Sequence, residues 1–190
     1  MARGLFGSRR RPGKAVPFLG LEMNAPSVTL RPTGVSELDF VLQLERHPDN
    51  VPFIGQWSRD EHAAVIRAAD REHWIIEAET RPAGYLIAYD LVSRGFGVYV
   101  KRVVVESKGR GLGQAAIAWL TRHALDDLGA PYVWLAVLAD NVRAQRSYAA
   151  AGFGVARLAA VRRSACHQAV GGFSEGSLLM VHPSDASPGA

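Results

Sequence analysis

Three glycines alternate with other residues in the segment Lys108-Gly109-Arg110-Gly111-Leu112-Gly113. An apolar β-branched run precedes this segment, and a stretch with helical spacing follows it, which predicts a strand, a tight loop and the first turn of a helix. Glycines leave backbone N–H groups uncovered, and a helix start adds unpaired N–H groups and a positive dipole end. Because Lys108 and Arg110 add two cations, the segment predicts a site for a diphosphate rather than a carboxylate.

Two other interpretations of this segment stay open. The stretch from Gly111 to Ala116 also matches G-x-G-x-x-A, the fingerprint of dinucleotide-binding proteins, which would indicate a nucleotide-linked oxidoreductase. Against it, the motif lies in mid-chain, and Asp140 is too far along to be the acidic residue that closes the next strand. The glycines also suit a tight strand-to-helix turn that binds nothing.

A second segment favours one interpretation. After the strand-like run 132–138, five separated residues fit the pattern N-x-x-A-x-x-x-Y-x-x-x-G-F. With both segments in place, the chain resembles the GCN5-related N-acetyltransferases (GNAT). Their acyl-CoA loop has Arg or Gln, then Gly, then Gly or Ala at the positions held here by Lys108, Gly111 and Gly113. The resemblance covers about residues 27–182 and, within the family, points to the enzymes that acetylate ribosomal-protein N-termini. The five residues of the second pattern are Asn141, Ala144, Tyr148, Gly152 and Phe153.

The resemblance implies acetyl-CoA as co-substrate and a primary amine as acceptor. It places the diphosphate on the backbone of 110–113, and the pantetheine arm along the end of the preceding strand. A backbone N–H near Val103 would polarise the thioester. Tyr148 would be the general acid that protonates the departing sulfur. The residues expected to hold the cofactor are Val103, Val104, Val105, Lys108, Gly109, Arg110, Gly111, Leu112, Gly113, Gln114, Asn141 and Arg146; for Asn141 helix capping is an equal alternative, and for Arg146 a solvated side chain.

The acceptor side is less defined. The segment 47–57 would form a wall of the acceptor site, so Phe53 and Trp57 are candidate substrate contacts, with a core role as the alternative. Tyr99 stands where related enzymes often have a glutamate, and this leaves the general base unassigned. Glu77, Glu79, Asp90 or His47 would act through a water, or the amine would bind in its neutral form. A silent acyl-CoA-binding sensor is the remaining alternative.

Composition sets wider limits. The 190 residues are 48% hydrophobic, which suits one domain with a sizeable core. No run approaches the ~18 apolar residues of a membrane span. The single cysteine, Cys166, excludes an intrachain disulfide and favours a cytoplasmic protein. A monomer or a homodimer is expected. The histidines show no metal-ligand spacing, so no metal is expected.

The net charge of +4 resides in residues 1–22, which hold five basic residues and one acidic residue. We therefore expect a basic, disordered extension over residues 1–26, or a true start at Met23. Nucleic acid is not an expected partner, apart from weak contact through Arg9-Arg10-Arg11. A single domain over 27–182 and a frayed tail over 183–190 complete the organisation.

The predicted elements give the order β-α-α-β-β-β-α-β-α-β-β, a mixed α/β fold. Residues 27–31 form a strand, Ser36 and Ser58 each cap a helix, and strands 74–79 and 84–89 are joined by a turn at 81–84. A break at 93–95 leads to a long strand, 96–105. A helix runs over 113–128 to a left-handed cap at Gly129, and strand 132–138 lies parallel to the strand before it. A helix from Asn141 to Gly152 precedes two last strands, 154–161 and 177–181.

Overall fold

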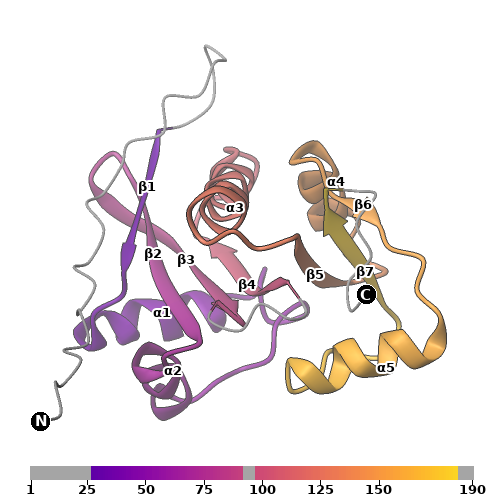
Figure 1. Ribbon diagram of the computed structural model, residues 1–190. Coiled ribbons are helices and arrows are strands. Elements are labelled where there is room, and N and C mark those ends of the chain that lie inside the picture. Colours follow the sequence, from indigo (N-terminus) through magenta and orange to yellow (C-terminus); the bar gives the residue numbers. More distant parts are fainter. Residues whose placement is uncertain (1–26, 92–96, 184–190) are drawn as a thin grey trace, which may run out of the picture.

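The computed structural model describes residues 27–91 and 97–183, and its seven strands form one sheet of order β1-β2-β3-β4-β5-β7-β6 (Figure 1). The mixed α/β class predicted from the sequence is confirmed. The strands are β1 Val28–Pro32, β2 Arg71–Ala78, β3 Arg81–Tyr89, β4 Val98–Val105, β5 Val133–Leu138, β6 Gly154–Val155 and β7 Ser177–His182. The helices are α1 Leu38–Glu45, α2 Arg59–Arg67, α3 Leu112–Arg122, α4 Val142–Ala150 and α5 Ala160–Ala169, and α3 continues as a π-helical turn, His123–Asp127.

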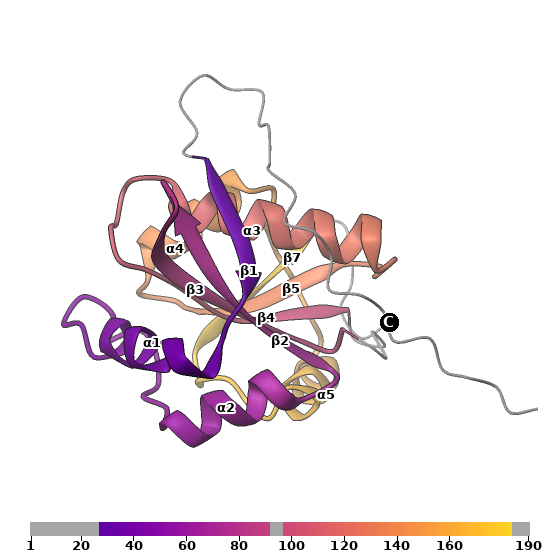
Figure 2. The ribbon, with the colours of Figure 1, turned by 90° about the vertical axis from the view of Figure 1, so that its left-hand side faces the viewer.

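Helices cover both faces of the sheet. Helices α3 and α4 lie on one face, and α1, α2 and α5 lie on the other (Figures 1 and 2). Each face has its own apolar cluster, with Leu112, Ile117 and Leu120 of α3 in one and Leu38 and Val41 of α1 in the other. Buried on both faces, β5 is a continuous apolar run, as expected for a covered strand, whereas β4 is apolar except for Lys101 and Arg102. No helix among the described residues is long and apolar enough to cross a membrane.

Strands β4 and β5 lie parallel at the centre of the sheet and then separate. Their pairing runs from Val98 opposite Val133 to Val100 opposite Leu135. Beyond Val100, β4 stays paired with β3 as far as Val105, while β5 stays paired with β7. The edge of β4 that faces β5 therefore has no strand partner over its last five residues within the described chain.

A bulge at Lys101 changes which face of the sheet the β4 side chains reach. Ile87 of β3 lies opposite Arg102, and the next residue, Ala88, lies opposite Val100, so Lys101 is the extra residue. A bulge of this kind shifts the alternation of side chains by one position. As a result, Val103 and Val105 pack toward α3, whereas Arg102 is buried on the side of α1 and α2.

Several predicted boundaries are confirmed. Ser58 caps α2 through a capping box, in which its Oγ accepts from the backbone N–H of Glu61 at 3.2 Å and Glu61 accepts from the N–H of Ser58 at 2.7 Å. Gly129 and Gly152 follow α3 and α4 with φ of 65° and 87°, the left-handed conformation that ends a helix. The parallel placement of β5 is also as predicted.

Three local predictions are wrong. Ser36 caps nothing, because it lies inside a 3₁₀ turn, Val35–Glu37, that runs directly into α1. The β2–β3 turn is Glu79-Thr80, with φ of 52° and 64°, so residues 81–84 belong to β3 and not to the turn. The predicted strand 154–161 shrinks to β6, and α5 follows it; β7 then inserts between β5 and β6. The break at 93–95, residues 1–26 and residues 184–190 lie outside the described residues.

Candidate active site

A large cavity opens where β4 and β5 separate. Its volume is about 840 Å³, and its walls come from the segment before α2, from β4, from the glycine segment and from α4. Most of the residues singled out in the sequence meet here. Those that line it are Phe53, Trp57, Tyr99, Val103, Val104, Val105, Lys108, Gly109, Gly111, Leu112, Gly113, Gln114, Asn141 and Tyr148.

The glycine segment forms an uncovered corner at one end of this cavity. Gly109 and Gly111 have φ of 76° and 75°, a conformation that L side chains rarely adopt. A Cβ at Gly109 would meet nothing within 4 Å, and one at Gly113 would meet Cγ1 of Val103 at 3.8 Å and Cγ1 of Val105 at 4.0 Å. Helix α3 starts after Gly111 with no side-chain cap, so its first N–H groups face open space. The corner therefore suits a phosphate group.

The cations near this corner are arranged differently from the prediction. Lys108 Nζ donates to Asn50 Oδ1 at 2.5 Å and to the carbonyl of Val105 at 2.6 Å, so it ties the loop to the segment before α2. Arg110 lies outside the cavity lining, and its Nη2 is 3.5 Å from an exposed Glu79 carboxylate. Arg146 is exposed and is also outside the lining.

Arg143 lines the cavity instead of Arg146, and sequence reasoning missed it. Four residues before Ser147, it lies on the face of α4 that carries Ala144, Ser147 and Tyr148 into the cavity. The signal that would have found it is its position directly before Ala144, a residue of the second sequence pattern, and four residues before Ser147.

Tyr148 reaches the cavity from the last turn of α4. The ring is half-buried, with its centre 6.2 Å from that of Phe153, and its hydroxyl has no hydrogen-bond partner among the described residues. Burial raises the pKa of the phenol to about 12. The hydroxyl is therefore protonated throughout the physiological range.

Asn141 caps α4 at the edge of the same cavity. Its Oδ1 accepts from the backbone N–H of Ala144 at 3.1 Å. The capping alternative from the sequence is thus observed, and its NH₂ group is not used in that bond. Gln114 of α3 links this helix to α4, because its Nε2 donates to the carbonyl of Ala150 at 3.4 Å.

The acceptor half of the cavity has aromatic walls. Phe53 is 36% exposed, whereas Tyr99 is 3% exposed and lies against Trp134, with ring centres 4.5 Å apart. Burial raises the pKa of Tyr99 well above its usual value, so this phenol is no base. Trp57 lines the cavity and also packs against the α1–α2 side of the core. Its position therefore fits both a substrate contact and a core role, the two alternatives given by the sequence.

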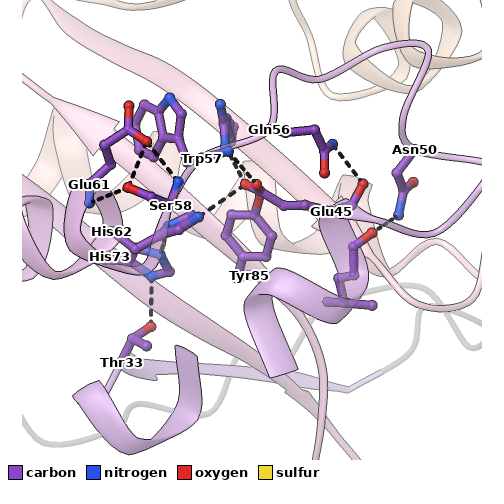
Figure 3. Close-up of polar contacts among 12 residues, drawn as sticks. Thr33, Glu45, Asn50, Gln56, Trp57, Ser58, Glu61, His62, His73 and Tyr85 are labelled. Atoms are coloured by element: carbon purple, nitrogen blue, oxygen red, sulfur yellow. Dashed lines mark hydrogen bonds and ion pairs between the residues drawn. The ribbon is translucent and has the colours of Figure 1, made fainter. Parts of the chain in front are cut away.

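A buried polar cluster behind Trp57 was missed in the sequence (Figure 3). At its centre Glu45 of α1, 1% exposed, accepts at Oε1 from Tyr85 Oη at 2.6 Å and from Arg102 Nη1. Its Oε2 accepts from the backbone N–H of Trp57 at 3.0 Å. Burial alone would raise the pKa of Glu45, but the bonds from His62, Tyr85 and Trp57 and the charge of Arg102 lower it to about 2.

The cluster continues away from the cavity through two histidines. His62 Nε2 is 3.2 Å from Glu45 Oε1, and His62 Nδ1 is 3.1 Å from His73 Nε2. His73 Nδ1 is in turn 2.8 Å from Thr33 Oγ1. Burial and the neighbouring His62 lower the pKa of His73 to about 3, so His73 is neutral. The chain of contacts fixes Arg102, whose guanidinium stacks 3.9 Å from the centre of the Trp57 ring.

No Asp or Glu lines the cavity within the described residues. Glu77 is held by Arg31 at 2.8 Å, Glu79 faces Arg110, and His47 is 3.9 Å from Asp49. Neither these three nor Asp90 reaches the lining, so none of the bases considered in the sequence is placed for the reaction. Among the described residues, no group of three His, Cys, Asp or Glu side chains is arranged to hold a metal.

Comparison with known proteins adds the decisive observation. A family model described as the acetyltransferase (GNAT) family matches residues 38–153, more than half of the chain. The chain belongs to this family. The match spans the glycine segment and Tyr148, so the resemblance drawn from those two motifs is confirmed. As a GNAT member the protein is an acyl-CoA-dependent N-acetyltransferase with acetyl-CoA as its co-substrate.

Solved structures share the GNAT fold at low identity. RimJ of Mycobacterium smegmatis in complex with CoA-disulfide is 17% identical with a TM-score of 0.66, over 90% of this chain and 87% of that one. AAC(6')-Ib in complex with paromomycin and acetyl-CoA is 18% identical with a TM-score of 0.65, over 84% and 99%. A chimera of spermidine N-acetyltransferase SpeG from Vibrio cholerae and hSSAT is 18% identical with a TM-score of 0.63, over 81% and 93%. A search of curated proteins finds no match.

Proposed function

We propose that this GNAT enzyme moves the acetyl group of acetyl-CoA to a primary amine by direct attack on the thioester, with Tyr148 as general acid. One observation carries the proposal. The cavity brings the uncovered glycine corner, the unpaired edge of β4 and the Tyr148 hydroxyl together around one space. The similar structures include a spermidine N-acetyltransferase chimera and AAC(6')-Ib in complex with paromomycin and acetyl-CoA, and both spermidine and paromomycin are amines.

The residues of the cavity divide the binding of acetyl-CoA between them. Backbone N–H groups of residues 110–113 would hold the diphosphate, and Arg143 supplies the nearby positive charge. The free edge of β4 over Val103–Val105 offers backbone groups to the amides of the pantetheine arm, as a missing strand would. Acetyl-CoA, once bound, supplies the thioester carbonyl that is attacked and the thiolate that leaves.

Tyr148 supplies the proton that the leaving sulfur requires. A phenol with a pKa of about 12 is a weak acid for a thiolate that has a pKa of about 8.5 in water. The same burial also raises the pKa of the thiol, because desolvation disfavours every anion in the cavity. The two pKa values therefore move together, and proton transfer from the hydroxyl keeps a modest cost.

The amine is deprotonated before it reaches the thioester. The described lining holds no carboxylate, and its one imidazole, that of His167, is 3.2 Å from the carbonyl of Phe173. Lys101, Lys108 and Arg143 line the cavity without an ion pair to any carboxylate of the described chain, and their field favours the neutral amine over the charged one. The enzyme would thus draw on the neutral fraction of its acceptor.

The test is a thiol-release assay with acetyl-CoA and a panel of amines, on wild type and Tyr148→Phe. We expect kcat to fall about 100-fold or more in Tyr148→Phe, with little change in the Kd of acetyl-CoA. Tyr89→Phe is the matched control, because it removes a phenol hydroxyl outside this cavity. Full activity of Tyr148→Phe would contradict the role of the hydroxyl, and tight acetyl-CoA binding without turnover of any amine would favour a silent sensor.

A further inference from the structure

The charge of the cavity wall is of one sign. Lys101, Arg102, Lys108 and Arg143 line it, and no Asp or Glu of the described residues does. Two of these cations, Lys108 and Arg143, lie at the glycine corner. The other two, Lys101 and Arg102, are adjacent on β4, beside Trp57.

Lys101 and Arg102 are too far along β4 to serve the phosphates of the cofactor. A strand rises about 3.3 Å per residue, so Lys101 lies about 13 Å from Val105, where the glycine segment begins. The pantetheine arm occupies that interval in the proposed binding mode. This pair of cations therefore faces the acceptor half of the cavity.

Arg102 has the geometry of a fixed anion receptor. It is 7% exposed, its Nη1 donates to Glu45, and its plane is stacked on Trp57. Its Nη2 lies beside Gly55, where an added Cβ would be 3.4 Å away, and both Arg102 and Gly55 line the cavity. A guanidinium held in this way loses little conformational freedom when it binds a carboxylate.

Lys101 adds a positive charge that the protein leaves unbalanced. Its Nζ donates to the carbonyl of Gly172 at 3.3 Å, and no carboxylate lies within ion-pair distance of it in the described chain. The bulge makes Lys101 the extra residue of β4 and so sets it at the wall of the cavity beside Arg102. A half-buried ammonium next to a guanidinium is costly unless an anion joins them.

We propose that the acceptor is a primary amine that carries a carboxylate, such as a free amino acid or a short peptide, and that Arg102 and Lys101 bind this carboxylate. The inference rests on the proposed acetyl transfer and names the substrate class of the same site. Polyamines and aminoglycosides are excluded as good acceptors, because their charges would meet cations in the wall and no carboxylate.

Matched pairs of acceptors test the substrate class. Each amino acid or dipeptide is compared with its C-terminal amide, which keeps the amine and removes the negative charge. We expect kcat/KM at pH 8 to be at least about 10-fold higher for the acid, as for a lost charge-assisted hydrogen bond. The amide has the more acidic ammonium and thus the larger neutral fraction, so its reactivity works against the expected preference. Spermidine and kanamycin complete the panel as polycations.

A charge substitution locates the receptor. Lys101→Gln should lower kcat/KM for the acid about 10-fold and reduce the ratio of acid to amide. Arg67→Gln is the matched control, because it removes one positive charge from an exposed position of α2 outside the cavity. Arg102 is left intact, since its loss would leave the buried carboxylate of Glu45 without its cation and strongly destabilise the protein.

The outcomes separate the two proposals. Equal or better turnover of the amides or of spermidine overturns the carboxylate receptor and leaves acetyl transfer to amines standing. An unchanged ratio of acid to amide in Lys101→Gln removes Lys101 from the receptor. Acetyl-CoA binding without turnover of any acid, amide or polyamine overturns the acetyl transfer itself.

Discussion

The Tyr148 hydroxyl combines two properties that bear on the pH dependence of the enzyme. It faces the cavity without a partner among the described residues, and burial raises its pKa to about 12. Between pH 6 and pH 10 it therefore keeps its proton while the acceptor amine loses one. We expect kcat/KM to rise through this range, and we expect Tyr148 to contribute no falling limb before pH 10. Steady-state rates in overlapping buffers measure this profile. A falling limb near pH 9 that disappears in Tyr148→Phe would show that the phenol titrates far below 12.

His73 makes a separate prediction for stability. Burial lowers its pKa to about 3 in the folded protein, against an ordinary value of 6.5, so the unfolded chain binds the proton that the folded chain refuses. The contribution of neutral His73 to the free energy of unfolding is fully present above pH 6.5. It is lost as the pH falls toward 3, by about 1.4 kcal/mol per pH unit at most. Urea unfolding between pH 6.5 and pH 5 should show a shallower loss in His73→Gln than in wild type.

His123 serves as the control with the opposite sign. Glu72 and Asp127 outweigh burial and raise its pKa in the folded protein. Protonation below the pKa of the folded state thus adds stability, and His123→Gln should lose stability more steeply than wild type on acidification. Identical slopes in the two variants would mean that neither histidine governs acid unfolding.

At the scale of elements, a substitution at the start of α3 should change both the stability of the protein and its affinity for acetyl-CoA. Gly113 has an ordinary helical backbone, so Gly113→Ala should stabilise the protein by up to about 1 kcal/mol. The same methyl group would enter the glycine corner beside Val103 and Val105 and raise the Kd of acetyl-CoA about 10-fold. Thermal unfolding and acetyl-CoA titration of this one variant give both values. Tighter binding together with higher stability would place the cofactor elsewhere.

Much of the element order was predictable, because glycines, prolines and apolar runs mark it. The exceptions have physical causes. Thr80 adopts φ of 64°, unusual for a β-branched residue, while Pro82 sits inside β3 next to a bulge, so the apparent turn residues misled. Helix α5 starts after Ala159 with no side-chain cap and no acidic residue in its first turn, which removes the usual start signals.

The parts of the candidate site that depend on backbone conformation were predictable from the sequence. The parts that depend on buried charged side chains were not. The glycine corner, Asn141 and Tyr148 are local in sequence, and their spacing places them. The receptor pair and its support are not local, since Glu45 and Arg102 are 57 positions apart. The available signal was Glu45 at the end of an apolar helix face and Arg102 inside an apolar strand, positions where a charge is retained only with a partner.

At the scale of the whole molecule, Cys166 reports on the docking of α5. It is the only cysteine of the sequence, it is fully buried on the inner side of α5, and burial raises the pKa of its thiol. We expect Ellman's reagent to label native protein at least about 100-fold more slowly than protein in urea, since the thiolate is the reactive form and is inaccessible. Rapid labelling under native conditions would mean that α5 opens freely. Slow labelling also makes released CoA the main thiol seen in activity assays.

The separation of β4 from β5 divides the sheet into two halves. Strands β1–β4 form one half and β5–β7 the other, joined through the short pairing at Val98–Val100. A ligand bound along the free edge of β4 would also contact α4, which lies with the β5–β7 half, and would therefore connect the two halves of the sheet. Saturation at 100 times the Kd would add about 2.7 kcal/mol to the folded state. Where acetyl-CoA is abundant, the bound co-substrate would then contribute part of the stability of the folded enzyme.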